Sequence, residues 1–300
     1  MGVLRRISAL ALVVKKDNSG AGVLCSEVAE MLGRRGVDFT VYRFPEDEIP
    51  CSFPPRIGLI LVFGGDGTLI FVARKCLGLN IPIGGVNFGR VGFLNELSAH
   101  NCRVVLQKTL DAGLGTREFV SLPFRVFGDG GLEKLRGEAV NDIVITRGNV
   151  ARLIALDVAL NNTPFISFRS DGLIFSTPAG STGYSGSAGG PLLPPDLHAY
   201  LMTAICPYLS NFPPLALGLE NVVSVCAAEG NSENLHLTVD GQDAYQLSPG
   251  DLLEVGAVKG RFIMADFGVS GYFERLLRCG FVRPAGDPPT CSSGGIHARH

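Results

Sequence analysis

The alternation of buried strands and helices in the first hundred residues is the feature that most constrains the fold of this chain. Residues 7–14 form an almost continuous apolar run, which is typical of a strand covered on both faces. Apolar residues then recur at helical spacing over 24–32. Further strands are expected at 39–44, 57–63 and 81–86, and a second helix is expected over 68–77. Strands that alternate with helices in this way predict a parallel sheet with helices on its faces.

The pattern changes after about residue 118, where helical spacing nearly disappears. Asn161-Asn162 predicts a tight hairpin turn, Asp171-Gly172 predicts another turn, and one helix is expected around 197–206. A short amphipathic stretch at 272–278 is expected to return to the first domain. The sequence therefore predicts a second, β-rich domain, with strands at 119–126, 139–146, 153–160, 163–168, 173–177, 222–226, 235–240 and 252–258.

Composition and charge exclude several classes of protein. Hydrophobic residues make up 46% and charged residues 18% of the 300 residues, so a packed core rather than disorder is expected. The net charge of −2 argues against a protein that coats nucleic acid. No apolar run is long enough to cross a membrane. The eight cysteines are scattered, with no C-x-x-C pair and no secretory signal, which indicates reduced thiols in a cytoplasmic protein.

The sharpest motif is Gly64-Gly65-Asp66-Gly67-Thr68, which follows a buried strand and opens a helix. In an open parallel sheet this position is the carboxyl edge, where ligands bind. Glycines there allow backbone N–H groups to surround phosphate oxygens. A carboxylate inside such an anion site suits a base, or a partner of a metal that bridges phosphates. Capping of the following helix is the structural alternative for Asp66.

A second glycine-rich segment runs from Gly84 to Phe93 and follows the next strand, so it is expected on the same edge. Asn87 could bond a base or a hydroxyl, and Arg90 could contact phosphate. A glycine-rich linker between domains explains this segment equally well when it is read alone. Neither glycine segment fits G-x-G-x-x-G and the chain has no G-x-x-x-x-G-K-[ST], which excludes an ordinary dehydrogenase fingerprint and a P-loop.

Two further segments carry polar groups. Asn141-Asp142 interrupts an apolar strand, and an amide beside a carboxylate suits the vicinal hydroxyls of a ribose. On local evidence alone, a strand edge that faces water is the better explanation of this pair. From residue 176 to Pro191, hydroxyls and glycines dominate, with Tyr184 in the middle. A flexible linker seldom has a proline at each end and an aromatic ring between them, so a binding loop is favoured.

These four segments, in this order, resemble the ATP-NAD kinase family over residues 57–273. The first is similar to the GGDG[TS] motif of that family, and Gly85 to Leu94 is similar to its G-x-N-x-G-x-x-G-F-L segment. Asp171-Gly172 and 177–191 are similar to its D-G…T-P-x-G-S-T-A-Y-S…A-G-G-P pattern, and 240–242 and 272–274 to its later segments. The chain departs from the family in having Asp142 in place of Glu and Gly183 in place of Ala.

The resemblance implies an NAD kinase, which transfers the γ-phosphoryl of ATP to the 2′-hydroxyl of the adenosine ribose of NAD. Asp66 would be the catalytic residue that orients or deprotonates this hydroxyl. No dedicated metal site is expected, because Mg²⁺ would arrive on the nucleotide phosphates, with Asp66 as its one candidate protein ligand. The residues implied to contact NAD are Gly67, Asn141, Asp142, Asp171, Thr182, Gly183, Tyr184, Ser187 and Gln242. The residues implied to contact the donor phosphates are Gly64, Gly65, Gly67, Thr68, Asn87 and Arg90.

The same resemblance implies a Rossmann-like α/β nucleotide-binding domain over 1–97, to which 268–283 return, and a β-sandwich-like NAD-binding domain over 98–267. Residues 284–300 are expected to be a disordered tail. The family forms homodimers or homotetramers, and its site can take residues from a neighbouring subunit. Two alternatives stay open: a lipid kinase of the diacylglycerol or sphingoid type, which also carries a GGDG motif, and a non-catalytic NAD(P)-binding sensor.

Overall fold

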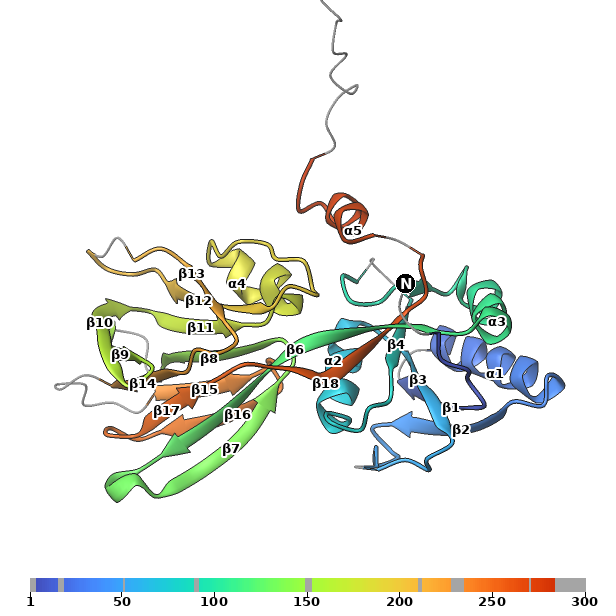
Figure 1. The fold of residues 1–300 in the computed structure, drawn as a ribbon, viewed down its shortest axis with the longest axis horizontal. Coiled ribbons are helices and arrows are strands. Elements are labelled where there is room, and N and C mark those ends of the chain that lie inside the picture. The colour runs from blue at the N-terminus through green and yellow to red at the C-terminus, as the bar shows by residue number, and fades with distance from the viewer. Residues whose placement is uncertain are drawn as a thin grey trace, which may run out of the picture.

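The computed structural model describes residues 4–15, 19–50, 52–88, 92–148, 153–209, 212–227, 235–269 and 271–283. Two lobes lie side by side, an α/β lobe built mainly from the N-terminal third of the chain and a β lobe built from its middle (Figure 1). In the described residues, no helix is both long and apolar enough to cross a membrane.

The α/β lobe is built on a parallel sheet whose strands are β1 (Ala9–Lys15), β2 (Asp38–Phe44), β3 (Ile57–Phe63) and β4 (Ile83–Asn87), in the order β4-β3-β1-β2. Leu10 and Leu12 join the core under α1 (Ser19–Arg34) and α3 (Cys102–Ala112). Ala11 and Val13 point the other way, into the core that contains the apolar side of α2 (Asp66–Lys75). Burial on both faces is the reason for the continuous apolar run in this first strand.

Helix α3 extends the α/β core beyond residue 97, where the resemblance places the start of the second domain. Cys102 and Leu106 of α3 are fully buried with Val28 and Leu32 of α1. The short strand β5 (Leu97–Ser98) pairs with β4 just before this helix. By its packing, α3 therefore belongs to the α/β lobe.

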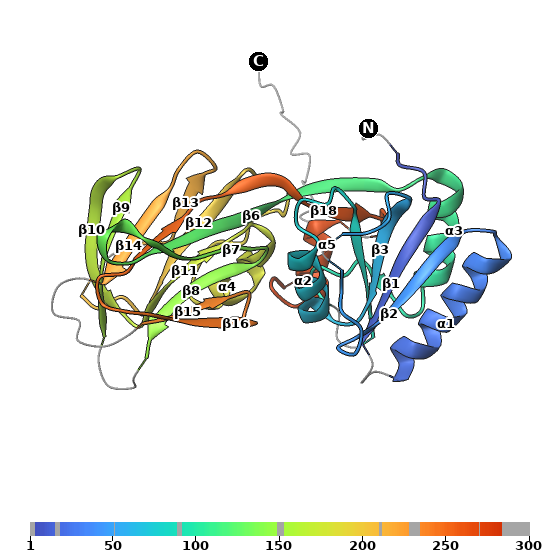
Figure 2. The same ribbon diagram turned by 90° about the horizontal axis from the view of Figure 1, so that it is seen from below.

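Two long strands, β6 (Gly115–Phe127) and β18 (Val258–Asp266), pass between the lobes (Figure 2). The first half of β6 pairs with β18 beside β4, and its second half pairs with β17 (Leu252–Val255) and β7 (Glu133–Ala139) in the β lobe. One twelve-stranded sheet is therefore continuous through the molecule. This continuity ties the position of one lobe to that of the other through backbone hydrogen bonds.

The β lobe is a sandwich of two mostly antiparallel layers, which confirms the predicted fold class. One layer is the distal part of the long sheet, with β9 (Ile154–Leu160), β10 (Thr163–Ser170) and β14 (Val223–Ala227) beside β17, β6 and β7. Buried residues of both layers, such as Phe124, Val225, Leu173 and Tyr200, form one core. The second layer contains β8 (Asp142–Arg147), β11 (Gly172–Ser176), β12 (Ala199–Ile205), β13 (Leu215–Gly218), β15 (Leu235–Val239) and β16 (Asp243–Leu247).

One turn prediction is confirmed and one helix prediction is wrong. Asn161 and Asn162 both have positive φ, 51° and 64°, and join β9 to β10 as the predicted hairpin. The helix expected around 197–206 is instead the strand β12, which lies between β11 and β13 and is buried from Tyr200 to Ala204. A short apolar run fits a buried strand as well as a buried helix, and here the neighbouring strands decide.

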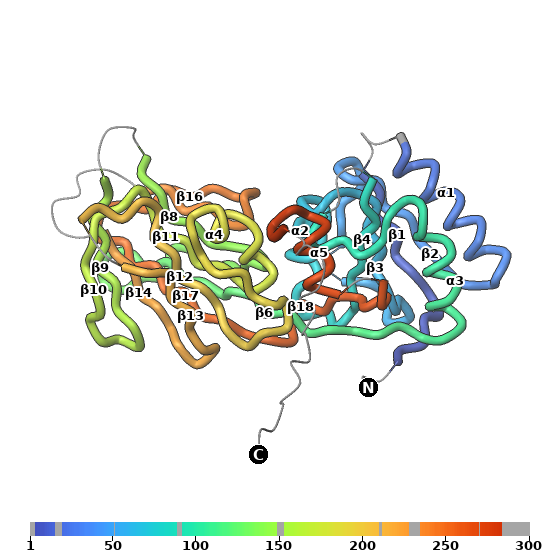
Figure 3. Tube along the Cα trace, turned by 90° about the horizontal axis from the view of Figure 1, so that it is seen from above, coloured from blue at the N-terminus to red at the C-terminus, as the bar shows by residue number. Residues whose placement is uncertain are grey.

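The C-terminal helix α5 (Tyr272–Arg278) lies at the seam between the lobes (Figure 3). Its Tyr272 and Leu276 form a small apolar cluster with Phe93 of the α/β lobe, and Leu192 of the β lobe packs against this cluster. The remaining helical elements are α4 (Tyr184–Ser187) and two 3₁₀ turns, Asp129–Gly131 and Ala179–Thr182. Helix α5 therefore contacts segments that come from both lobes.

Candidate active site between the lobes

The glycine-rich turn after β3 begins the site. The amide of Gly64 donates to the carbonyl of Val86 at 3.0 Å, so this turn lies against the end of β4. A Cβ on Gly64 would lie 3.0 Å from the buried side chain of Thr68, so the turn and the helix are tightly packed at this glycine. Gly65 and Gly67 are exposed, and a Cβ on either would meet no atom within 4 Å. Their backbone is open to a ligand at the start of α2, where N–H groups and the helix dipole favour anions.

Asp66 is the first residue of α2, and its carboxylate holds the segment 92–95. Oδ2 accepts hydrogen bonds from the backbone amides of Phe93 (2.7 Å) and Leu94 (3.2 Å). Oδ1 accepts from the backbone amide of Asn95 at 3.3 Å and also from its side-chain amide. A Cβ on Gly92 would lie 2.2 Å from Oδ1, so a side chain at position 92 would displace the carboxylate. The second glycine-rich segment is therefore the shell around Asp66 rather than a plain linker.

Asn141 and Asp142 are held in place by a buried carboxylate that belongs to another turn. Asp240 Oδ1 accepts from the amides of Asn141 (2.7 Å) and Asp142 (3.0 Å), and its Oδ2 accepts from the amide of Val140 (3.1 Å). The amide of Asp240 in turn donates to the carbonyl of Asp142 at 2.8 Å. Asp240 adopts a φ of 54° ahead of Gly241, a turn that brings its side chain under these amides. The polar pair therefore lies in a turn whose backbone amides are hydrogen-bonded to Asp240.

The segment from 177 to 191 packs directly on this turn. Thr177 donates its hydroxyl to the carbonyl of Val140 at 2.9 Å. Gly180 lies so close that a Cβ there would be 2.2 Å from the carbonyl oxygen of Asn141. A Cβ on Gly183 would lie 3.2 Å from Asn141 Nδ2 and 3.8 Å from Asp142 Oδ2. The structure therefore brings Gly183, and the α4 turn with Tyr184 and Ser187 that follows it, beside Asn141-Asp142.

Two side-chain contacts connect this group with the turn of Asp66. Gln242 donates its side-chain amide to the carbonyl of Gly67 at 3.0 Å. Arg74 of α2 forms ion pairs with Asp240, at 3.2 Å between Nε and Oδ2, and with Asp243. Val140 and Ala179 of the β lobe also join the apolar core that contains α2. The α2 turn and the Asn141-Asp142 turn therefore form one assembly across the seam.

Burial raises the pKa of Asp142 from 3.8 to about 6. Desolvation is the main cause, the nearby Asp240 carboxylate adds to it, and the Asn141 amide, 3.0 Å from Oδ2, opposes it. Burial also raises the pKa of Asp240, although three backbone amides and Arg74 favour its charged form. Burial together with the neighbouring Asp240 carboxylate therefore gives Asp142 a pKa of about 6.

A second buried ion pair anchors α5 beside the shell of Asp66. Glu96 directly follows that shell and accepts from Arg117 (2.6 Å), Arg275 (3.2 Å) and the amide of Phe267 (3.0 Å). The guanidinium of Arg275 also lies over the ring of Phe93, 5.6 Å from its centroid. Desolvation raises the pKa of Glu96, and the two arginines oppose that rise. The helix α5 and the amides that hold Asp66 are thus joined through Phe93 and Glu96.

Most, but not all, of the expected site residues lie together. Gly64, Gly65, Gly67 and Thr68 surround Asp66, and Asn87 ends the neighbouring strand β4. Asp171 lies apart, because it precedes β11 and the strand separates it by about 16 Å from the end that pairs with Asp142. There it forms an ion pair with Arg147 at 3.0 Å. Thr182 closes the 3₁₀ turn before Gly183. Arg90 falls outside the described residues.

Sequence reasoning missed the supports of the site, namely Asp240, Arg74, Asn95, Glu96 and Arg275. The one local signal was the Asp-Gly pair at 240–241, which is typical of a turn. The partners of these side chains lie far away in the sequence, and Asn141 and Asp240 are 99 positions apart. Within the described residues no group of three or more His, Cys, Asp or Glu side chains could hold a metal ion. That part of the chain therefore provides no metal cage of its own.

The comparisons with known proteins match this architecture. The ATP-NAD kinase N-terminal domain matches residues 4–114, and the ATP-NAD kinase C-terminal domain matches residues 140–265. A protein named NAD kinase from Nitratidesulfovibrio vulgaris is 42% identical over 278 residues, 92% of each chain. The chain belongs to the ATP-NAD kinase family. A second member of the family, the NAD kinase of Oleidesulfovibrio alaskensis, is 38% identical over 93% of this chain and 95% of its own.

Solved structures of the family share the two-lobe fold. An NAD kinase from Archaeoglobus fulgidus in complex with ATP has a TM-score of 0.69 and 25% identity, and the match covers 91% of this chain and 99% of that one. Yeast NADH kinase complexed with NADH has a TM-score of 0.80 at 22% identity, covering 94% and 89%. Relatives of the chain are thus phosphotransferases, and neither a lipid kinase nor a non-catalytic sensor is favoured.

Proposed function

We propose that this chain transfers the γ-phosphoryl of ATP to the 2′-hydroxyl of the adenosine ribose of NAD. The observation that carries the proposal is the assembly of Asp66 with the Asn141-Asp142 turn across the seam, through Gln242 and Gly67. Phosphoryl transfer depends mainly on position and charge stabilisation. In this assembly the carboxylate of Asp66 lies in the glycine-rich turn, which is joined to the Asn141-Asp142 turn, and this supports a donor site next to an acceptor site. Membership of the family supports the same reaction.

In this proposal the open backbone of Gly65 and Gly67 binds the donor phosphates, with Gly64 and Thr68 shaping the turn and Asn87 and Arg90 completing it. Asp66 orients or deprotonates the attacking hydroxyl. In the structure the Asp66 carboxylate accepts four hydrogen bonds from residues 93–95. Some of these hydrogen bonds must therefore break when the substrate hydroxyl binds to one of the carboxylate oxygens. The NAD ribose and its amide groups bind Asn141 and Asp142, and Thr182, Gly183, Tyr184, Ser187 and Gln242 line the dinucleotide.

Magnesium enters this proposal as part of the ATP substrate. The described residues offer no cluster of ligands for a resident ion, which favours an ion held by the donor phosphates. When bound, Mg²⁺ neutralises phosphate charge, while the protein positions the hydroxyl and the leaving group. Asp66 is the one carboxylate in the glycine-rich turn that could contact such an ion.

We also infer a homodimer or homotetramer. Asp171 lies at the opposite end of β11 from its own Asn141-Asp142 turn, so Asp171 could serve an NAD site only in another copy. The chain presents this residue only half-buried, where a second subunit could reach it. A reducing, cytoplasmic compartment is supported by the free thiols of four described cysteines, which are Cys25, Cys102, Cys206 and Cys226.

Incubation with NAD and Mg²⁺, with either ATP or polyphosphate, tests the reaction and the donor. Formation of NADP, followed with an NADP-specific dehydrogenase, supports the proposal. Diacylglycerol and sphingosine are offered in parallel as acceptors. Phosphorylation of lipid without formation of NADP would overturn the proposal in favour of a lipid kinase, and saturable NAD binding without turnover would overturn it in favour of a sensor.

A further inference from the structure

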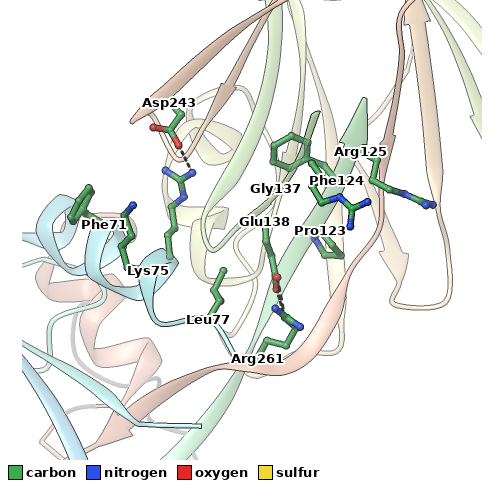
Figure 4. A pocket seen from close by; sticks show the side chains of 12 residues that line it. Phe71, Lys75, Leu77, Pro123, Phe124, Arg125, Gly137, Glu138, Asp243 and Arg261 are labelled. Carbon is green, nitrogen blue, oxygen red and sulfur yellow. Dashed lines mark hydrogen bonds and ion pairs between the residues drawn. The ribbon is translucent and has the colours of Figure 1, made fainter. Parts of the chain in front are cut away.

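A second pocket opens between the lobes, away from Asp66. Its volume is about 610 Å³, and it lies between the C-terminal half of α2 and the strands β6 and β7 (Figure 4). Asp66 begins α2 and Lys75 ends it, so the α2 residues that line the pocket, Phe71 to Lys75, lie about 7 to 13 Å along the helix from Asp66. Pockets of this size at domain interfaces are typical of small-molecule sites. None of the residues expected to bind NAD or the donor phosphates lines this pocket.

The walls of the pocket combine cationic and apolar surface. Two carboxylates face five cationic side chains, a net charge of +3 for the lining. Phe124 and Gly137 contribute apolar surface on the side of β6 and β7. The Phe124 ring packs against Gly137, because a Cβ on Gly137 would lie only 2.6 Å from the ring. Phe71 and Leu77 complete the apolar wall on the side of α2. The cationic residues are Arg74, Lys75, Arg125, Arg136 and Arg261, and the acidic ones are Glu138 and Asp243.

The cationic side chains differ in whether they already form an ion pair with a carboxylate. Arg261 pairs with Glu138 (2.9 Å), and Arg125 pairs with Glu254 (3.0 Å), which lies outside the pocket. Among the residues that the structure describes, Arg136 pairs only with Glu133, three residues away on the surface. Lys75 lies 5.9 Å from the centroid of the Phe71 ring, and it makes no ion pair with any residue that the structure describes. Lys75 of α2 and Arg136 of β7 both line the pocket and are therefore the charges most available to a ligand.

We propose that this pocket binds a small organic anion with a planar apolar body and that its occupancy weakens dinucleotide binding. Acidic groups of such a ligand contact Lys75 and Arg136, and its planar part lies among Phe71, Leu77 and Phe124. The effect on NAD passes through Arg74, which lines the pocket and also pairs with Asp240, the carboxylate that holds Asn141. An anion that attracts Arg74 competes with Asp240 for the guanidinium and loosens the NAD turn. The coupling to NAD rests on the proposed function, whereas binding of the anion to the pocket is independent of it.

The test uses 8-anilinonaphthalene-1-sulfonate, a planar fluorescent sulfonate, as the probe. Titration of the intact protein should give one saturable site, and Lys75→Ala and Arg136→Ala should each raise the dissociation constant about five- to tenfold. Matched controls are Lys108→Ala on α3 and Arg34→Ala on α1, the latter in an exposed pair with Glu30 like that of Arg136 with Glu133. Unchanged probe affinity in either pocket variant, or equal losses in the controls, would overturn the proposal.

The coupling is measured by repeating the probe titration at rising NAD concentrations. An effector site predicts that the apparent dissociation constant of the probe rises to a plateau, and that saturating probe weakens NAD binding by the same factor. A rise without limit would place the probe in the NAD site and overturn the proposal. No effect of NAD on the probe would overturn the coupling even if the pocket variants lose affinity. A protein that binds the probe but forms no NADP would contradict the proposed function and leave the pocket intact.

Discussion

Arg74 of helix α2 and Asp240 of the β lobe form an ion pair, with Nε 3.2 Å from Oδ2 and the Asp240 side chain fully enclosed. The same carboxylate accepts the backbone amides of Val140, Asn141 and Asp142. One buried charge therefore both fixes the Asn141-Asp142 turn and joins it to the helix that begins with Asp66.

Asp240→Asn should lower the free energy of unfolding by about 3 kcal/mol and weaken NAD binding at least tenfold. The variant leaves Arg74 partly unpaired and turns an amide NH₂ toward backbone N–H groups, and breaking a buried ion pair in this way is costly. Urea denaturation and NAD titration measure the two effects. Asp243→Asn is the matched control, since Asp243 is the other partner of Arg74 and is 45% exposed, so a loss below about 1 kcal/mol is expected. Equal losses in the two variants would contradict the special role of Asp240.

Asp66→Asn should keep the fold and NAD binding but lower turnover about a hundredfold or more, because a positioned base typically contributes ~10²–10⁴-fold. The structure adds a complication, because the amide also disturbs the hydrogen bonds to residues 93–95. Asn95→Ala separates the two effects, since it removes one hydrogen bond to the carboxylate and leaves the charge in place. Steady-state kinetics should show a much smaller loss of turnover in that control. Turnover near that of the unmodified enzyme in Asp66→Asn would remove Asp66 from catalysis.

Gly183→Ala should be tolerated, whereas Gly180→Ala should disrupt the loop. The new methyl at 183 would lie 3.1 Å from the Gly180 carbonyl oxygen and 3.2 Å from the mobile end of the Asn141 side chain, so a shift of a few tenths of an ångström accommodates it. At 180 the methyl would lie 2.2 Å from a backbone carbonyl that cannot move freely. Thermal unfolding should change by less than about 1 kcal/mol at 183, where loss of a glycine also reduces unfolded-state entropy. Similar melting temperatures for both variants would contradict this packing.

The stability contributed by Asp142 should depend on pH. Because its pKa is raised to about 6 in the folded protein from 3.8, the folded state holds the proton more tightly than the unfolded chain. This contribution to stability is complete below about pH 3.8 and is lost as the pH rises through 6. Asp142→Asn should therefore gain stability relative to the unmodified protein between pH 4 and 6.5, by up to about 3 kcal/mol. Urea denaturation at several pH values measures this difference, and a constant difference across that range would refute the raised pKa.

Local patterns in the sequence determined the parallel sheet, because strands buried on both faces and helices with one apolar face leave periodic signals. They also indicated the Asn161-Asn162 hairpin and the edge where Gly64 and Asn87 meet, since the carboxyl ends of adjacent parallel strands lie together. For Asn141-Asp142, local evidence favoured a strand edge in water. The chemistry of the pair also suited a ribose, and the resemblance to a family favoured that interpretation.

Tertiary contacts decided the rest. Strand β12 took the place of a helix because two neighbouring strands bury it, which no local spacing encodes. Asp240 and Arg74 became the support of the site because buried charges require partners, and the chain supplies those partners from distant segments. Asp171 lay apart from Asn141 because strand length, not motif order, sets the distance between the two ends of β11. A sequence carries its periodic patterns locally, whereas the pairing of charges and strands exists only once the chain has folded.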